Sequence, residues 1–294
     1  MTSDTAGAAV GTLSSSRLAI IGAGVMAESM IAGLLAGDMI APDRIVASHP
    51  RVERRDQLAA KFGIRAVESN AEAARDADLI LLTIKPQVLS GVMRQMKGSL
   101  REGQVVISIL AGASIRALRT GLDHDAIVRV MPNTPAQIGE GMAVWCCTGA
   151  VDEIARDRVR AALGALGDEL QVDSENYVDM ATALSGTGPT YVFLMMEALI
   201  DAGVHMGFPR RIAEQIVLQT VGGSVAYARS SGKHLAELRN MVTSPGGTSA
   251  AAIYQMEKGG LRTILSKSVH AAYQRTQTLA AEQEQKLGEG MKPG

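Results

Sequence analysis

The stretch Leu18-Ala19-Ile20-Ile21-Gly22-Ala23-Gly24-Val25-Met26-Ala27 decides the fold. A short apolar run, typical of a buried strand, ends at Ile21, and a glycine-rich turn leads into a helical pattern over Met26–Ala36. In such a turn the first glycine allows a tight reversal, the second lets the backbone approach a pyrophosphate, and the third position, here Ala27, must be small. The start of the helix adds positive potential for an anion. The stretch therefore predicts dinucleotide binding.

Short apolar runs alternate with helical patterns from Arg17 to about Gln171. Continuous apolar strands are typical of a parallel sheet that is covered on both faces. The alternation predicts an α/β fold with an N-terminal Rossmann-like, doubly wound, mostly parallel sheet. The expected strands are Leu18–Ile21, Arg44–Ala47, Leu79–Ile84, Val105–Ile109, Ile127–Val130 and Met142–Cys147, and the expected helices are Met26–Ala36, Arg51–Phe62, Val88–Met96 and Asp152–Leu166.

Helical patterns alone follow Asp173, which predicts an all-helical C-terminal domain. We expect a disordered tail over residues 1–16, a dinucleotide-binding domain over 17–173, a helical domain over 174–281 and a fraying tail over 282–294. The expected helices of the second domain are Tyr177–Ala183, Thr190–Ala202, Arg210–Arg229, His234–Val242, Thr248–Glu257 and Leu261–Ala280.

Composition excludes several classes of protein. The 294 residues are 47% hydrophobic and 20% charged, which is typical of a globular chain, and the net charge of -1 offers no basic field for nucleic acid. No apolar run approaches the roughly 18 residues that a membrane span needs, and the first residues lack a signal peptide's pattern. Cys146 and Cys147 are adjacent, so we expect packed strand thiols, no metal site and a cytoplasmic location.

The end of the second expected strand indicates which dinucleotide is bound. A carboxylate there would bond the ribose hydroxyls of NAD and repel a 2′-phosphate, but Asp43 lies before the strand, at its other end. Ser48 and Arg51 offer a hydroxyl and a guanidinium instead. We therefore expect NADPH to be preferred, with NADH as a second cofactor. The alternative is that Arg51 and residues 53–55 form a solvated helix start.

Three further motifs go beyond a general dinucleotide fold. They are Met131-Pro132-Asn133-Thr134-Pro135, Ser185-Gly186-Thr187-Gly188-Pro189-Thr190-Tyr191 and Val242-Thr243-Ser244-Pro245-Gly246-Gly247-Thr248-Ser249. Together with Gly22–Ala27 and Ile84-Lys85-Pro86, this set resembles the signature of pyrroline-5-carboxylate reductases, from about residue 17 to residue 280. The resemblance implies hydride transfer from NAD(P)H to the C=N bond of 1-pyrroline-5-carboxylate, an imino acid, giving L-proline in the last step of proline biosynthesis.

The resemblance also implies roles for individual residues. Along the cofactor, the pyrophosphate would lie on Gly22, Gly24, Val25 and Met26, the adenosine phosphate and ribose on Ser48 and Asn70, and the nicotinamide end near Ile84, Lys85, Pro86, Ala111, Gly112 and Asn133. The substrate carboxylate would be held by Gly246, Gly247, Thr248 and Ser249, in a domain that binds substrate and dimerises.

The carboxylate role has a physical basis of its own. Ser244–Thr248 reads as a glycine loop that enters a helix, so successive N–H groups and the helix start form an anion site without a charged side chain. The alternative is an ordinary loop in which Thr248 caps the helix. The family usually has threonine where Ser249 stands, and its hydroxyl would bond the ring nitrogen. Two hypotheses remain for the proton: Ser249 donates it, or the imine arrives protonated.

Two other classes compete with this reading. A β-hydroxyacid dehydrogenase-like enzyme, or another imine reductase, would share the cofactor domain. The dehydrogenases need a helix lysine, but no lysine follows a glycine-rich motif in the early helical domain of this sequence. A non-catalytic NADP-binding sensor would need no carboxylate loop. The helical domain carries an apolar face with Val192, Met195 and Leu199, and Gly222-Gly223 suggests close helix packing. The resemblance implies a homodimer at least, with a decamer left open.

Overall fold

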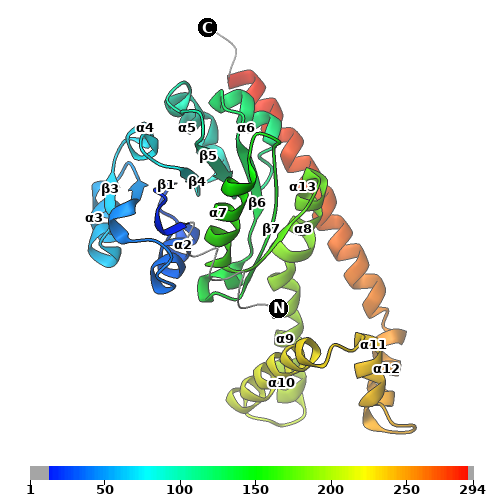
Figure 1. The fold of residues 1–294 in the computed structure, drawn as a ribbon. Coiled ribbons are helices and arrows are strands. Elements are labelled where there is room, and N and C mark those ends of the chain that lie inside the picture. The colour runs from blue at the N-terminus through cyan, green and yellow to red at the C-terminus, as the bar shows by residue number, and fades with distance from the viewer. Residues whose placement is uncertain (1–12, 291–294) are drawn as a thin grey trace. The chain divides into compact units, whose positions relative to one another are not determined.

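The computed structural model describes residues 13–290, with side chains as far as residue 285. An eight-stranded sheet forms its centre, in the order β3-β2-β1-β4-β5-β6-β7-β8 (Figure 1). All neighbouring strands are parallel except β6 and β7, which confirms the mostly parallel, doubly wound sheet. The strands are β1 Leu18–Ile21, β2 Ile45–Ser48, β3 Arg65–Val67, β4 Leu79–Leu82, β5 Val105–Ser108, β6 Ile127–Met131, β7 Gly141–Cys147 and β8 Gly167–Gln171.

Helices cover both faces of this sheet because successive strand residues point to opposite sides. On β1, Leu18 and Ile20 face one core and Ala19 and Ile21 face the other. The first core is closed by α2 Val25–Ala36, α3 Val52–Phe62 and α7 Glu153–Gly164, and the second by α4 Asn70–Ala74, α5 Leu89–Met96 and α6 Ile115–Leu122.

The chain reverses its order across the sheet between β1 and β4. From β1 it winds outward to β2 and β3, and then returns to β4 on the other side of β1. The carboxyl ends of β1, β4, β5 and β6 therefore share one edge of the sheet. In open α/β sheets, ligands bind at this edge, next to the strand pair where the order reverses.

The helical part consists of α8 Glu175–Ala181, α9 Gly188–His205, α10 Arg210–Ser231, α11 Leu235–Met241, α12 Thr248–Lys258 and α13 Leu261–Gly290. From Glu175 onward the described chain is thus helical, as expected. A short π-helical turn, η4, covers Thr182–Gly186 between α8 and α9, and three 3₁₀ turns lie in the sheet domain: η1 Pro42–Arg44, η2 Pro86–Val88 and η3 Thr134–Ile138.

Packing divides the chain into two compact units, residues 1–187 with 272–294 and residues 188–271. The boundary expected at 173/174 differs because α8 is fixed to the sheet. Arg129 on β6 is buried, and its guanidinium lies 2.7 Å from a Glu175 carboxylate oxygen and 2.6 Å from one of Asp179. A strand arginine whose partners are on a helix some fifty residues later leaves no pattern in the sequence.

Both expected tails are shorter than the sequence suggests. Leu13 is fully buried in the first core and Ser16 is buried as well, so the expected tail over residues 1–16 is wrong from residue 13 onward. Residues 1–12 and 291–294 lie outside the described part of the chain. From residue 282, where the sequence predicts a fraying tail, α13 continues to Gly290. There, the Gln283 side chain donates to the carbonyl of Pro86 at 3.1 Å, and Ser114 donates to Glu284 at 2.7 Å.

The second unit, residues 188–271, buries few of its side chains. Its two longest helices meet where Gly203 of α9 lies against Ala213 of α10, and a Cβ on Gly203 would be 3.1 Å from that of Ala213. Gly222 and Gly223 face open space, so no other described residue makes the close approach that they suggest. Among the described residues, no helix combines the length and the apolar character that a membrane crossing requires.

Candidate functional site

The glycine-rich turn after β1 has the geometry that a pyrophosphate needs. Gly22 has φ +107°, a conformation that other residues rarely adopt. A Cβ there would lie 3.0 Å from a methyl group of Ile84 and 3.1 Å from the backbone of Thr83. Gly24 is open, since an added Cβ would meet only the Thr83 carbonyl, at 3.9 Å. The first glycine is therefore required by the turn, and the second leaves space for a ligand.

The N-terminus of α2 faces the same space with uncapped N–H groups. Gly24 is the N-cap residue and supplies no side-chain acceptor, and the first helical hydrogen bond runs from the Glu28 N–H to the Gly24 carbonyl. The N–H groups of Val25 and Met26 thus have no acceptor within the helix. Val25 is 62% exposed while Ala27 is fully buried against the sheet. This arrangement fits a dinucleotide pyrophosphate, as predicted.

The adenosine end of the predicted site is organised around Ser48, the last residue of β2. Ser48 is 1% exposed and its hydroxyl donates to the side-chain oxygen of Asn70 at 2.7 Å. The Asn70 amide nitrogen in turn donates to Gln95 at 2.6 Å. The structure thus joins two predicted residues and adds Gln95, which no local sequence pattern marks. No carboxylate follows β2 directly, and Asp43 lies in η1 before the strand.

Three arginines follow β2, and two of them are committed to protein partners. Arg54 donates to the Ala23 carbonyl and to Glu28, and Arg55 donates to the carbonyls of His49 and Pro50. Arg51 is exposed at the N-cap of α3, and no side-chain hydrogen bond or ion pair joins it to another described residue. Burial lowers the pKa of His49 beside it, and the positive charges of these arginines act in the same direction.

The predicted nicotinamide end lies along the carboxyl ends of β4 and β5. Ile84 contacts the Gly22 turn, and Lys85 is the exposed N-cap residue of η2, which begins at Pro86. After β5, Ala111 is half-buried and Gly112 is buried with φ +77°. A Cβ on Gly112 would lie 3.4 Å from the α13 backbone at Leu279. The predicted residues therefore share one edge, which α13 also contacts.

Asn133 follows β6 at the same edge, and both ends of its amide are engaged. Its oxygen accepts from the Met142 N–H at 2.9 Å, and its nitrogen donates to the Ser185 hydroxyl at 3.1 Å. Ser185 lies in the π turn of η4. Ser185 belongs to one of the sequence motifs, but its contact with Asn133 spans 52 residues and leaves no local signal of a role.

The predicted carboxylate loop lies in the second unit. Gly246 has φ +73°, and Gly247 is the N-cap of α12, which begins at Thr248. A Cβ on Gly247 would lie 2.4 Å from the Ser244 hydroxyl and 3.1 Å from the Ser244 carbonyl, so a larger residue would crowd the turn there. The alternative in which Thr248 caps the helix is wrong: Thr248 is the first helical residue, and no side chain caps α12. Ser249 is half-buried in the first turn.

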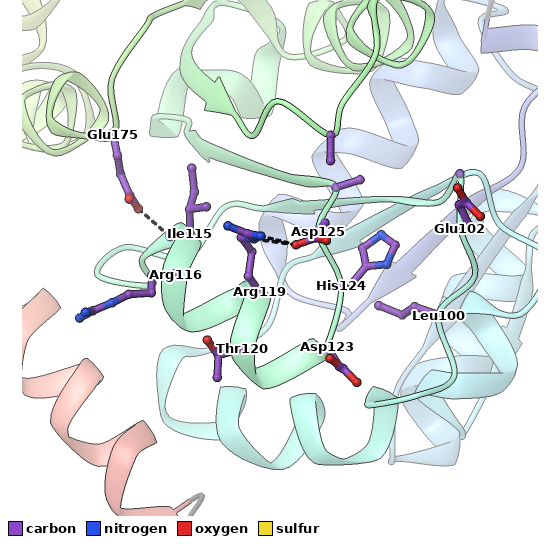
Figure 2. A pocket seen from close by; sticks show the side chains of 13 residues that line it. Leu100, Glu102, Ile115, Arg116, Arg119, Thr120, Asp123, His124, Asp125 and Glu175 are labelled. Carbon is purple, nitrogen blue, oxygen red and sulfur yellow. Dashed lines mark hydrogen bonds and ion pairs between the residues drawn. The ribbon is translucent and has the colours of Figure 1, made fainter.

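A separate cavity flanks α6 and reaches the loops before β5 and β6 (Figure 2). Two of its polar contacts lie within the lining: Arg119 donates to Asp125 at 2.9 Å, and Glu175 accepts from the Ile115 N–H at 2.8 Å. It contains none of the predicted site residues. We therefore place the candidate site at the carboxyl edge of the sheet and not in this cavity.

The fold and the glycine turn define a nicotinamide-dinucleotide-dependent oxidoreductase. Residues 17–112 match the family model described as NADP oxidoreductase, coenzyme F420-dependent, and residues 175–279 match that described as pyrroline-5-carboxylate reductase dimerisation. The second match begins close to the domain boundary expected from the sequence. The chain belongs to the pyrroline-5-carboxylate reductase family, as the relatives below establish.

Relatives of known identity cover almost the whole chain. A pyrroline-5-carboxylate reductase of Synechocystis sp. is 42% identical over 263 residues, which are 90% of this chain and 98% of the relative. The solved structure of the Coxiella burnetii enzyme has a TM-score of 0.86 at 33% identity, covering 90% of this chain and 98% of that chain. The Plasmodium falciparum enzyme, solved with NADP bound, has a TM-score of 0.82 at 30% identity, covering 91% and 99%. These matches favour the reductase over the dehydrogenase and sensor readings.

Proposed function

We propose that this pyrroline-5-carboxylate reductase reduces 1-pyrroline-5-carboxylate to L-proline with NADPH, through the residues at the carboxyl edge of the sheet and in the Gly246–Ser249 loop. The observation that carries the proposal is the Gly22 turn below an uncapped α2 start, in a chain 42% identical to a reductase of this kind. The bound reductant supplies a hydride to the imine carbon, and the imine nitrogen takes a proton. The protein's task is then to position the two reactants and exclude water.

The cofactor preference rests on the charges after β2. A 2′-phosphate carries negative charge. Of the three arginines, Arg51 is the one whose guanidinium has no hydrogen bond or ion pair to another described residue. Asn70 and the buried Ser48 hydroxyl support the ribose beside it. A charge-assisted hydrogen bond contributes about 1.5–3 kcal/mol. NADPH is therefore the preferred cofactor, with NADH as the weaker one.

The substrate carboxylate is assigned to the loop at the start of α12. Thr248, Ser249 and Ala250 begin the helix with N–H groups that have no acceptor within it, and the N-cap is a glycine. This supports an anion site made of backbone. The Ser249 hydroxyl has no side-chain hydrogen bond to another described residue, which leaves it available to the ring nitrogen as proton donor.

The assembly is a homodimer at least, formed through the second unit. The match to the dimerisation family supports this, as does the large apolar surface of α9 and α10 in the single chain. A decamer, the absence of nucleic-acid partners and a cytoplasmic location remain proposals, tested by light scattering, nucleic-acid retention assays and fractionation. The large apolar side chains exposed on α9 and α10 are Val192, Phe193, Leu194, Met195, Leu199, Val204, Ile216, Leu218, Val225 and Tyr227.

The direct test follows oxidation of NADPH and of NADH at 340 nm with 1-pyrroline-5-carboxylate as the variable substrate, and identifies the product as L-proline. Turnover with a higher kcat/KM for NADPH is the expected result. Turnover with NADH preferred would retain the reaction and contradict the assignment of Arg51. Absence of turnover in folded, cofactor-binding protein would contradict the substrate assignment.

A further inference from the structure

We propose that the Ser185 hydroxyl donates a hydrogen bond to the carboxamide oxygen of the bound nicotinamide, and that Asn133 is the positioning residue that directs it. The proposal rests on the proposed function, since it needs a nicotinamide at the carboxyl edge of the sheet. It assigns a cofactor contact to the motif Ser185–Tyr191, and it changes the role predicted for Asn133 from a direct contact to an indirect one.

The orientation of the Asn133 amide is fixed by a group that can only donate. The backbone N–H of Met142 lies 2.9 Å from the Asn133 side-chain oxygen, so the oxygen must occupy that side. The amide nitrogen then faces Ser185, at 3.1 Å from its hydroxyl oxygen. Because an amide nitrogen only donates, the Ser185 oxygen accepts in this pair.

The Ser185 proton is therefore left to point elsewhere. Its oxygen is held by Asn133, and the described residues supply no acceptor for the O–H. Ser185 is half-buried, so this unmatched donor is only partly accessible to water. A donor that is fixed in direction and lacks a partner in the protein is suited to a ligand acceptor, because leaving it unpaired in the bound state would cost affinity.

The turn that carries Ser185 is closed by its own hydrogen bonds and packs against β6. Both the N–H and the hydroxyl of Thr187 donate to the Thr182 carbonyl, each at 2.9 Å, which closes the π turn. Gly186 lies so close to Met131, the last residue of β6, that a Cβ would approach its terminal methyl to 2.4 Å. Single π turns of this kind often occur at functional sites.

The position of this turn selects the nicotinamide half of the cofactor. Ser48 and Asn70 lie on the β2 side of the Gly22 turn, whereas Asn133 and Ser185 lie beyond β4 and β5, on the opposite side. A dinucleotide laid across the β1–β4 switch point has its adenosine on the first side and its nicotinamide on the second. The carboxamide oxygen is the strongest neutral acceptor of that ring.

The test measures equilibrium binding by calorimetry, independently of turnover. We would titrate NADP⁺ and its thionicotinamide analogue, whose sulfur is a much weaker acceptor, into the wild type, Ser185→Ala and Ser185→Thr. Ser185→Ala is expected to weaken NADP⁺ binding about three- to tenfold, as for the loss of one hydrogen bond, and to change binding of the analogue less than twofold. Ser185→Thr retains the donor and should show the wild-type ratio of NADP⁺ affinity to analogue affinity.

Two further variants separate the proposed role from a structural one. Asn133→Asp keeps the acceptor for the Met142 N–H but presents a carboxylate oxygen to Ser185. Because this oxygen would accept the Ser185 proton, the variant should lose the preference for NADP⁺ over the analogue, as Ser185→Ala does. Thr187→Val removes a hydroxyl bonded only within the turn, and should lower Tm without changing the NADP⁺ to analogue ratio.

The outcomes separate the possible failures. An equal loss of both cofactors in Ser185→Ala, or an unchanged ratio in Asn133→Asp, would overturn the proposal. A rise in KM for the imino acid in Ser185→Ala, with unchanged cofactor binding, would assign the Ser185 hydroxyl to the substrate. This result would also overturn the proposal. A wild type that binds neither dinucleotide would instead overturn the proposed function itself.

Discussion

Arg54 clamps the cofactor turn by donating two hydrogen bonds to the carbonyl oxygen of Ala23, from Nε at 2.9 Å and from Nη2 at 2.7 Å. The same guanidinium pairs with Glu28 on α2 and donates to Gln57 at 3.1 Å. Because Ala23 stands between the two glycines, holding its carbonyl fixes the orientation of the neighbouring N–H groups. Arg54 on α3 thus orients the cofactor loop without having to contact the cofactor itself.

Replacing Arg54 by Met should raise KM for both nicotinamide cofactors by the same factor, about tenfold. The methionine keeps the apolar stem and removes the hydrogen bonds, so the turn would have to be ordered at the moment of binding. The kcat value at saturation should change little. Steady-state kinetics with NADPH and NADH would check this, and a loss confined to NADPH would show that Arg54 meets the 2′-phosphate directly.

The Glu28 partner of this clamp gives a pH prediction. Hydrogen bonds from Lys61 and then Arg54 hold the pKa of the Glu28 carboxyl below its ordinary value. A folded-state pKa below the unfolded one contributes stability that is complete above the ordinary pKa of about 4.3 and is lost as pH falls through the folded value. Wild type should therefore exceed Glu28→Gln in Tm at pH 7, with the gap closing towards pH 3. Glu102→Gln, at an exposed loop position, serves as the control and should show no such closing gap.

Arg51 should act in the opposite manner to Arg54, on one cofactor alone. Arg51→Ala is expected to raise KM for NADPH about ten- to a hundredfold and to leave that for NADH nearly unchanged, because only NADPH carries the 2′-phosphate. Parallel kinetics with the two cofactors decide the point. Equal changes would favour the alternative in which Arg51 is a solvated helix start.

Much of the sheet could be predicted because most of its strands are continuous apolar runs. The strand β4, Leu79–Leu82, is buried at every position, and its pattern is evident. The strands β3 and β8 were missed because they form the two edges of the sheet: β3 has three residues and begins at the exposed Arg65, and β8 alternates exposed Asp168 and Leu170 with half-buried neighbours. Edge strands of this kind lack the apolar signal.

The site was predictable where chemistry is local and not where it depends on distant partners. Gly22 requires its positive φ in any such turn, so a motif suffices to find it. The pairs Ser48–Asn70 and Asn133–Ser185 join residues 22 and 52 positions apart, and only the fold brings them together. The resemblance implies a cofactor role for Asn133, and only the fold reveals that its amide also bonds Met142 and Ser185.

The buried Arg129 should be necessary for stability because of the charges it neutralises. Arg129→Met would leave Glu175 and Asp179 facing a sheet without a counter-charge, at an expected cost of about 3 kcal/mol in the free energy of unfolding. The triple variant Arg129→Met, Glu175→Gln, Asp179→Asn removes the stranded charges and should recover a large part of the loss. Chemical denaturation of the three proteins measures this, and a triple variant no more stable than the single one would contradict it.

Ser249 decides between the two sources of the proton. If its hydroxyl protonates the imine nitrogen, Ser249→Ala should lower kcat, and the ratio of wild-type to variant kcat should grow as pH rises, because a smaller fraction of the substrate then arrives already protonated. Ser249→Thr keeps the hydroxyl and adds a methyl group that restricts rotation, so it should retain or raise kcat. The pH profiles of kcat for the three proteins, at saturating cofactor, provide the measurement. If Ser249→Ala has the wild-type kcat at every pH, the imine arrives protonated, and the role of the α12 start is limited to holding the carboxylate.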